Sequence, residues 1–257
     1  MGIKIMVANQ KGGVGKTTTA LETATCMAEQ GFKVLLVDLD QQCNLTTYLN
    51  ADDKKPNIYD VLSAKTTLED AICEISDTEN LYFIKGSPQL SKADKEFGES
   101  EDVFLLDTLF DLPEAKEYDY IIIDTNPARN TLLKMCYCSA DYVVFATECD
   151  KGSIDGITAL YNDIRVFKNL KVPFSHTEVL GVILNKFEPT SMHKLAMENI
   201  EEMTSEMNPN AFVMSVRKSI VVSEAKLYKE SLQKYKPWSN PAMDFRDITN
   251  KIIKLAV

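Results

Sequence analysis

Short apolar runs rich in β-branched residues recur along the chain, and longer stretches with helical spacing lie between most of them. Each short run has the length and composition of a β-strand. Several, such as residues 34–37 and 121–123, are apolar at every position, which is typical of parallel strands covered on both faces. The seven predicted strands are Ile3–Ala8, Lys33–Asp38, Leu81–Lys85, Tyr120–Asp124, Tyr142–Thr147, Val179–Asn185 and Ala211–Ser215.

The intervening stretches predict six helices, so that strands and helices alternate. This alternation predicts an α/β fold with one doubly wound, mainly parallel sheet and helices on both faces. We find no internal repeat, low-complexity tract or linker in the 257 residues, which predicts a single domain over 1–257. The six predicted helices are Thr17–Gln30, Val103–Leu112, Leu132–Ser139, Ser153–Phe167, Met192–Met207 and Met243–Leu255.

The loop between the first predicted strand and the first predicted helix is rich in glycine. It reads ANQKGGVGKTT over residues 8–18. Glycines allow successive backbone N–H groups to face a phosphate, and the helix N-terminus adds partial positive charge. We expect Lys16 to reach the β- and γ-phosphates of a nucleotide and the Thr17 hydroxyl to coordinate Mg²⁺.

Two predicted strands end in carboxylates. The segment VDLDQQ places Asp38 and Asp40 after one strand, and IIIDTNP places Asp124 after another. The carboxyl ends of parallel strands open into the same crevice as the phosphate loop. A carboxylate at the end of an apolar strand is costly to bury, so these residues are expected to serve Mg²⁺ and the attacking water.

Charge is distributed unevenly along the chain. The net charge is −10, yet residues 216–257 contain nine Lys or Arg and only four Asp or Glu. This asymmetry indicates either a basic contact surface or a solvated helical face. No apolar run approaches 18 residues, and the chain enters its first strand directly, so we expect neither a membrane span nor a signal peptide and a cytoplasmic protein.

The motifs resemble those of one superfamily. The string KGGVGKTT, with Lys11 at its start, resembles the deviant Walker A loop of the ParA/MinD superfamily of P-loop NTPases. VDLDQQ and IIIDTNP are similar to its Walker A′ and Walker B elements, and SEA at residues 223–225 resembles a late ParA element. The resemblance covers nearly the whole chain and is to small, Soj-like ParA proteins without an N-terminal DNA-binding domain.

The resemblance implies roles for individual residues. Lys11 would reach across a dimer interface to the partner's nucleotide, and Asp40 would orient the attacking water. Asp38 would lie near the metal, and Asp124 would hold Mg²⁺ through water. Asn185 would read the adenine edge, although a polar strand-end cap is an equally good interpretation of this residue. The implied nucleotide-binding set is Lys11, Gly12, Gly13, Val14, Gly15, Lys16, Thr17, Thr18 and Asn185.

The function implied by the resemblance is Mg-ATP-dependent partitioning of a plasmid, chromosome or mobile element. ATP would drive formation of a sandwich dimer that binds DNA without sequence preference on the nucleoid. A ParB-like centromere-binding partner would stimulate a slow ATPase. Val221 stands where many ParA proteins have a basic DNA-contacting residue, so the expected DNA contacts come from elsewhere in the basic C-terminal region. They are Arg217, Lys218, Lys226 and Lys229.

Three alternatives remain open from the sequence. A MinD-like positioning ATPase would need a membrane-binding C-terminal helix, and an apolar stripe does run along the last predicted helix. A metal-cluster reductase would need cysteines that bridge a dimer, and a scaffold protein would bind nucleotide without hydrolysis. VDLDQQ and SEA are more similar to ParA than to MinD, so membrane binding is not expected. The stripe consists of Phe245, Ile248, Ile252 and Leu255.

Overall fold

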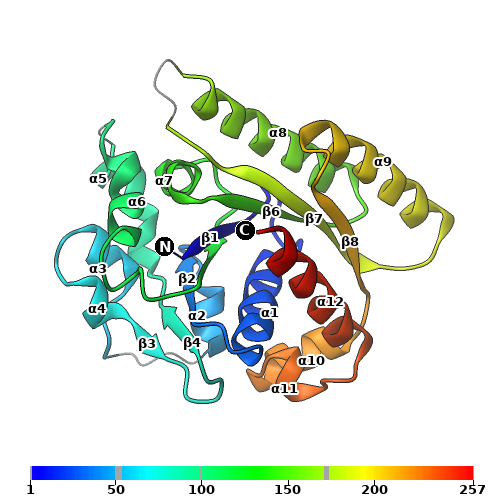
Figure 1. The fold of residues 1–257 in the computed structure, drawn as a ribbon, viewed down its shortest axis with the longest axis horizontal. Coiled ribbons are helices and arrows are strands. Elements are labelled where there is room, and N and C mark those ends of the chain that lie inside the picture. The colour runs from blue at the N-terminus through cyan, green and yellow to red at the C-terminus, as the bar shows by residue number, and fades with distance from the viewer. Residues whose placement is uncertain (1, 50–53, 99, 171–173, 257) are drawn as a thin grey trace.

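One eight-stranded sheet runs through the molecule and carries helices on both faces (Figure 1). The structure is a computed structural model that describes residues 2–49, 54–98, 100–170 and 174–256. The strand order is β3-β4-β2-β5-β1-β6-β7-β8. The strands are β1 (Ile3–Ala8), β2 (Val34–Leu39), β3 (Cys73–Glu74), β4 (Leu81–Ile84), β5 (Tyr120–Thr125), β6 (Tyr142–Thr147), β7 (Glu178–Phe187) and β8 (Phe212–Arg217).

The seven strands β1, β2 and β4–β8 pair in parallel, and only β3 joins the edge antiparallel, against β4. The central strands β1, β2 and β5 are almost entirely buried, as expected of parallel strands between two helical layers. Strand β1 lies between β5 and β6, so the loops that leave β1 and its neighbours meet at one edge of the sheet. This is where open α/β sheets bind ligands.

Two separate hydrophobic cores lie on the two faces of the sheet. One core packs α1, α10, α11 and α12 against the sheet, and the other packs α3, α4 and α6–α9 against the opposite face. The α-helices are α1 (Lys16–Glu29), α2 (Asn44–Leu49), α3 (Ile58–Leu62), α4 (Leu68–Ala71), α5 (Ala93–Glu96), α6 (Leu105–Phe110), α7 (Thr131–Ser139), α8 (Lys151–Lys168), α9 (Ser191–Met207), α10 (Val221–Tyr228), α11 (Leu232–Tyr235) and α12 (Asn240–Leu255).

The predicted doubly wound fold is confirmed, and all seven predicted strands are present with ends shifted by no more than two residues. The helix predicted over 103–112 is a 3₁₀ turn (Asp102–Phe104) followed by the shorter α6. The two-residue strand β3 and the short helices α2–α5, α10 and α11 were not predicted. Elements of this length carry too few periods of hydrophobic spacing to be recognised.

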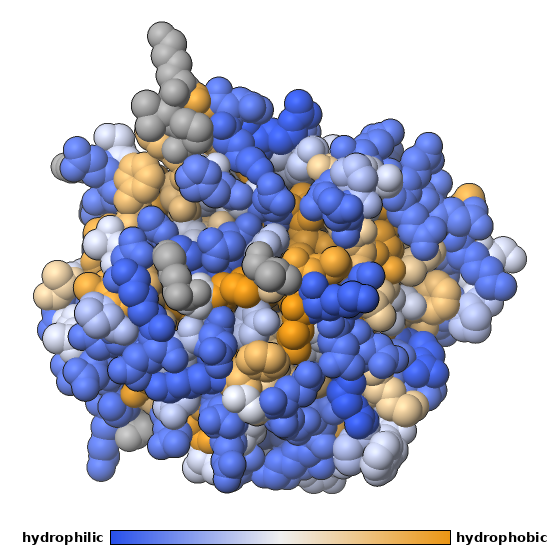
Figure 2. All heavy atoms as spheres, in the orientation of Figure 1, coloured by the Kyte–Doolittle hydropathy of each residue, from blue (hydrophilic) through white to orange (hydrophobic). Residues whose placement is uncertain are grey.

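The apolar stripe of the last predicted helix faces the protein interior. Phe245, Ile248 and Ile252 of α12 are fully or almost fully buried in the core that contains α1, and Leu255 is partly buried against it. The stripe therefore packs on the protein's own core. The face shown in Figure 2 is mainly hydrophilic, with hydrophobic residues gathered toward its centre. Among the described residues, none of the helices is long and apolar enough to cross a membrane.

A buried carboxyl group links helix α1 to the C-terminal region. Glu22 is 1% exposed, and its Oε1 accepts a hydrogen bond from the Leu232 backbone N–H at 2.8 Å. Its Oε2 has no hydrogen-bond partner among the residues described. Burial is the main cause that raises the pKa of Glu22 to about 8. The folded protein therefore retains a proton here that the unfolded chain loses at lower pH.

This group should make stability depend on pH. The folded state binds more protons at Glu22 than the unfolded state between its ordinary pKa of 4.5 and about 8, so the free energy of unfolding should fall as pH rises through this window. Glu22→Gln keeps the acceptor for Leu232 but cannot ionise. Urea unfolding of wild type and variant between pH 5 and 9 should therefore show a smaller loss of stability with pH in the variant, by up to roughly 1.4 kcal/mol per pH unit.

Glu198 provides the control, since it is an exposed glutamate on α9, outside the groups that act on Glu22. Glu198→Gln should leave the pH dependence in place. If the wild-type and Glu22→Gln curves ran parallel across the whole range, ionisation of Glu22 would not contribute to the pH dependence.

Candidate functional site

The glycine-rich loop curls between β1 and α1 in the conformation that its sequence predicts. Gly13 and Gly15 have positive φ angles of 81° and 94°, and Gly15 is the N-cap of α1. These left-handed conformations favour glycine because a side chain would be strained there. Lys16 is 7% exposed and donates a hydrogen bond from Nζ to the Lys11 carbonyl at 3.1 Å. The lysine thus lies folded back across the mouth of its own loop.

Two buried asparagines hold this loop in place. The Asn185 amide, two residues before the end of β7, donates to the Val14 carbonyl at 2.8 Å, and a Cβ on Gly15 would lie 2.6 Å from its Nδ2. Asn9 donates to the Ala146 carbonyl at 2.8 Å and accepts from the Lys11 backbone N–H at 2.9 Å. Asn185 therefore holds the loop through the Val14 carbonyl. Its predicted contact with adenine stays a prediction.

The two predicted acidic strand ends lie side by side. Asp38 on β2 pairs in register with Asp124 on β5, and both are 0% exposed. Burial raises the pKa of Asp38 to about 6, although hydrogen bonds from Thr46 and Asp40 act against this. Burial, followed by the negative charge of Asp38, raises the pKa of Asp124 well above its ordinary value. Two adjacent buried carboxylates disfavour each other's ionisation unless a cation is present.

The environment of Asp124 fits a magnesium site. Neither of its carboxylate oxygens has a hydrogen-bond partner among the described residues, although both are buried. No group of three or more His, Cys, Asp or Glu converges as a metal cluster in the part of the chain that the structure describes. Mg²⁺ fits such a site, since it takes few protein carboxylates and completes its coordination with waters and substrate phosphates. Thr17 and Asp124 are the residues that would hold it.

Lys16, Asp40 and Asp124 converge on one place. Burial lowers the pKa of Lys16, and the nearby negative charges of Asp124 and Asp40 act against this lowering. Asp40 is 7% exposed; its backbone N–H donates to Asp38 Oδ1 at 3.0 Å, and its own Oδ1 accepts from the Gln42 N–H at 2.9 Å. The structure therefore brings one buried lysine together with two carboxylates, Asp124 and Asp40, next to the buried Asp38.

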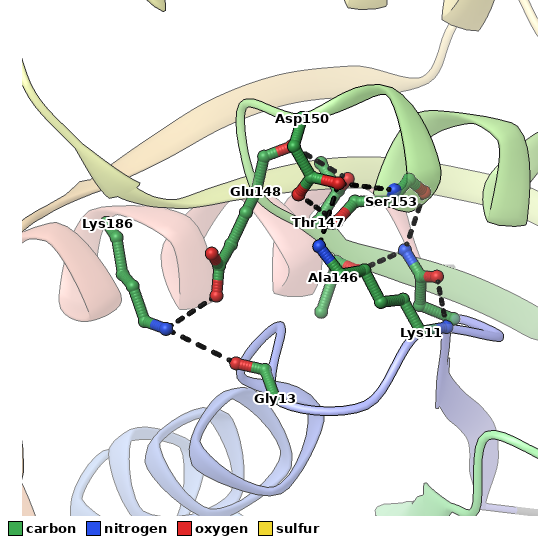
Figure 3. A network of polar contacts seen from close by, with 9 residues as sticks. Lys11, Gly13, Ala146, Thr147, Glu148, Asp150, Ser153 and Lys186 are labelled. Carbon is green, nitrogen blue, oxygen red and sulfur yellow. Dashed lines mark hydrogen bonds and ion pairs between the residues drawn. The ribbon is translucent and has the colours of Figure 1, made fainter.

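Lys11 does not point into its own phosphate loop. Its Nζ forms an ion pair with Asp150 Oδ1 at 2.7 Å, at the start of α8 (Figure 3). A second ion pair lies beside it, between Lys186 Nζ and Glu148 Oε1 at 2.6 Å, and Lys186 also donates to the Gly13 carbonyl at 3.4 Å. Both lysines at the mouth of the loop are therefore held by acids from the β6–α8 connection.

The four predicted DNA contacts have different surroundings. Arg217 forms a bidentate ion pair with Asp244, with the closest approach at 2.6 Å, and Lys218 pairs with Glu188 at 3.0 Å. Lys226 is exposed and lines a small depression beside α1 with Thr17 and Thr18. Lys229 ends α10 in a left-handed conformation and lines a cavity of about 300 Å³. Arg217 and Lys218 are therefore ion-paired, whereas Lys226 and Lys229 line two different depressions.

Several residues that shape the site were not predicted. They are Asn9, Thr46, Gly86, Glu148 and Asp150. The sequence offered one signal, the polar Asn9 directly after the apolar run of the first strand. The others make their contacts with residues distant in the chain, or lie within loops without periodicity.

Comparisons with known proteins agree with this geometry. Residues 2–176 match a family model described as an AAA domain. The sporulation initiation inhibitor protein Soj of Bacillus subtilis (strain 168) is 31% identical over 257 residues, covering 98% of each chain. The septum site-determining protein MinD of Pyrococcus horikoshii OT3, solved with Mg-ADP, has a TM-score of 0.77 at 26% identity and covers 100% of this chain and 98% of its own. Apo McdA of Cyanothece, at 21% identity and a TM-score of 0.85 over 98% of this chain and all of its own, shares the fold.

The position of Lys16 makes nucleotide binding testable. Lys16→Ala should lower ATP affinity by about 100-fold or more, because the phosphates lose a buried, charge-assisted donor. Equilibrium dialysis with ATP and Mg²⁺ measures this directly. Lys33→Ala is the control, since this lysine lies at the opposite end of β2 and pairs with Glu117. Near-normal ATP affinity in Lys16→Ala would contradict the assignment of the loop.

Proposed function

The chain belongs to the ParA/Soj family of partitioning ATPases, and from this premise we propose that it is a Mg-ATP-dependent partitioning ATPase working as a nucleotide-sandwich dimer. The observation that carries the proposal is the convergence of Lys16, Asp40 and Asp124 at the carboxyl ends of β1, β2 and β5, with Lys11 held outside this group. A lone nucleotide-binding module would need no second lysine at this place. We propose a single ATPase domain over residues 1–257.

Hydrolysis needs a positioned water and neutralisation of the charge that develops on the phosphates. Lys16 would bind the β- and γ-phosphates, and the Asp40 carboxylate would orient water in line with the γ-phosphate. Mg²⁺, held by Thr17 and Asp124 beside Asp38, would supply Lewis-acid stabilisation of the phosphate oxygens. The chain's own contribution is thus to place three side chains around one phosphate group and to exclude bulk water from it.

Lys11 would complete this site from the opposite subunit. Its Nζ bonds to Asp150 of its own chain, so the ion pair has to break before Lys11 can reach a partner's nucleotide. A cation supplied in trans stabilises transition-state charge as an arginine finger does. Hydrolysis by a lone subunit would then be slow, which leaves room for stimulation by a ParB-like partner.

Lys11→Ala should retain ATP binding but slow hydrolysis at least about 10-fold and weaken ATP-dependent dimerisation, because the charge supplied to the partner site is lost. Turnover assays and light scattering with ATP and Mg²⁺ measure the two effects. Asp150→Asn is the matched partner variant: it retains an oxygen to cap α8 through Ser153 but no longer neutralises Lys11. We expect it to dimerise at lower protein concentration. Wild-type turnover in Lys11→Ala would contradict the trans role.

We further propose that the dimer binds DNA without sequence preference and acts on the nucleoid. The support is the net charge of +5 over residues 216–257, against a strongly acidic remainder. Contacts between Lys or Arg and phosphates give affinity without sequence reading. Arg217 and Lys218 are paired with acids in the single chain, so their contribution requires that DNA phosphates replace Asp244 and Glu188.

Replacing Arg217 and Lys218 together by Gln should weaken DNA binding equally across sequences and reduce the slope of log affinity against log salt by roughly 2. Filter binding with ATP, at several salt concentrations, measures both. The double variant Lys251→Gln and Lys254→Gln carries the same change in net charge on exposed positions of α12. Equal losses in both double variants would indicate a bulk charge effect. Unchanged DNA affinity in the Arg217 and Lys218 double variant would exclude these two residues as DNA contacts.

A MinD-like membrane function is the second candidate, and the likeness to MinD at 26% identity is the observation that favours it. The residues that such a function would use are occupied, since the apolar stripe of α12 is packed against α1. We therefore place the partitioning function first. Binding to liposomes but not to DNA, by an ATP-bound dimer, would reverse this order.

A further inference from the structure

Donors from its own loop surround the Asp38 carboxylate. Its Oδ1 accepts the Asp40 backbone N–H at 3.0 Å. Its Oδ2 accepts both the backbone N–H of Thr46 at 2.9 Å and the Thr46 hydroxyl at 2.7 Å. A carboxylate that is 0% exposed and accepts three hydrogen bonds is held firmly, and it holds its donors in return.

The Thr46 hydroxyl also connects to a third segment. It accepts a hydrogen bond from the backbone N–H of Gly86, after β4, at 2.8 Å. Gly86 itself approaches closely, because a Cβ at this position would lie 2.9 Å from Asp38 Cγ. The contacts among Asp38, Thr46 and Gly86, which we call the Thr46 clasp, therefore join the ends of β2 and β4 to the first turn of α2.

The clasp encloses the segment that carries Asp40. Residues 40–46 begin and end on the same carboxylate, since Asp40 donates to one oxygen of Asp38 and Thr46 to the other. Inside the segment, the Cys43 N–H donates to the Asp40 carbonyl at 2.9 Å, and Cys43 has a positive φ of 52°. A strained non-glycine conformation persists only where its surroundings hold it. The position of Asp40 thus depends on both ends of the loop.

We propose that Thr46 is a positioning residue for ATP hydrolysis: through Asp38 and Gly86 its hydroxyl fixes the segment that aims the Asp40 carboxylate at the attacking water. The inference rests on the proposed function, because it assigns Asp40 to that water. Thr46 lies outside the phosphate loop and is not expected to bind nucleotide. Its loss should therefore lower turnover without lowering ATP affinity, because misplacement by about 1 Å can reduce rate 100-fold.

The test compares two substitutions that separate the hydroxyl from the volume. Thr46→Val has the same shape but no hydroxyl, and Thr46→Ser has the hydroxyl without the methyl group. With ATP and Mg²⁺, kcat should fall about 10- to 100-fold in Thr46→Val, while the dissociation constant for ATP stays within about 3-fold of wild type. Thr46→Ser should restore most of kcat. Wild-type kcat in Thr46→Val, or equal losses in both variants, would overturn the proposal.

Amide hydrogen exchange on the nucleotide-free protein gives a readout that does not depend on hydrolysis. The Asp40 and Gly86 amides should exchange faster in Thr46→Val than in wild type, and Thr46→Ser should protect them. Thr47→Val is the control, since its exposed hydroxyl donates to the Cys43 carbonyl and, among the residues described, contacts neither Asp38 nor Gly86 through a hydrogen bond. Unchanged exchange of both amides in Thr46→Val would overturn the clasp. A wild-type protein that binds ATP but never hydrolyses it would contradict the proposed function instead.

Discussion

The arrangement of the site depends on two carboxylates buried side by side. Parallel pairing of β2 with β5 places Asp38 opposite Asp124, away from solvent. Burying one charge is costly, and burying two of the same sign is more so. The surroundings of the two carboxylates offset this cost of burial in different ways. The Asp38 carboxylate accepts three hydrogen bonds, two from Thr46 and one from the Asp40 backbone N–H, whereas Asp124 is left with both oxygens unpartnered among the described residues. Asp38 is therefore held by hydrogen bonds within the fold, whereas Asp124 is the carboxylate that would bind a cation in the proposed function.

The lysines around the loop also differ in burial and in their acidic neighbours. Lys16 is buried beside Asp40 and Asp124, where its ammonium is desolvated and has little freedom to move. Lys11 and Lys186 lie at the mouth, half-exposed, in ion pairs with Asp150 and Glu148. Exposed ion pairs contribute little stability, so they are inexpensive to break. Lys16 is thus fixed in position by its buried surroundings. Lys11 and Lys186 are held by ion pairs that a partner or ligand can replace.

The sequence predicted the parts of the site that are local in the chain. The glycine loop, Lys16 and the strand-end carboxylates are recognisable because a buried parallel strand leaves an apolar signal and its last residue lies at a known edge of the sheet. Thr46, Gly86 and Asp150 were not predicted because their roles arise from contacts across segments. Gly86 meets Thr46 40 positions away, which composition and spacing do not encode. For Asn185 the sequence offered an adenine contact or a strand-end cap, and its hydrogen bond to the Val14 carbonyl was not predicted.

Helix α1 connects the phosphate loop to the C-terminal region. It begins at the loop, and its Glu22 reaches the backbone of Leu232 at the start of α11. Lys226 of α10 lines a depression together with Thr17, Thr18 and Glu22 of α1. The basic region is therefore packed against the nucleotide-binding helix, while Arg217 and Lys218 are neutralised by acids from neighbouring segments. A single chain consequently presents little uncompensated positive charge at Arg217 and Lys218. An increase in positive potential on ATP binding then has to come from bringing two such regions together, which makes dimerisation the step that couples nucleotide to DNA in the proposed function.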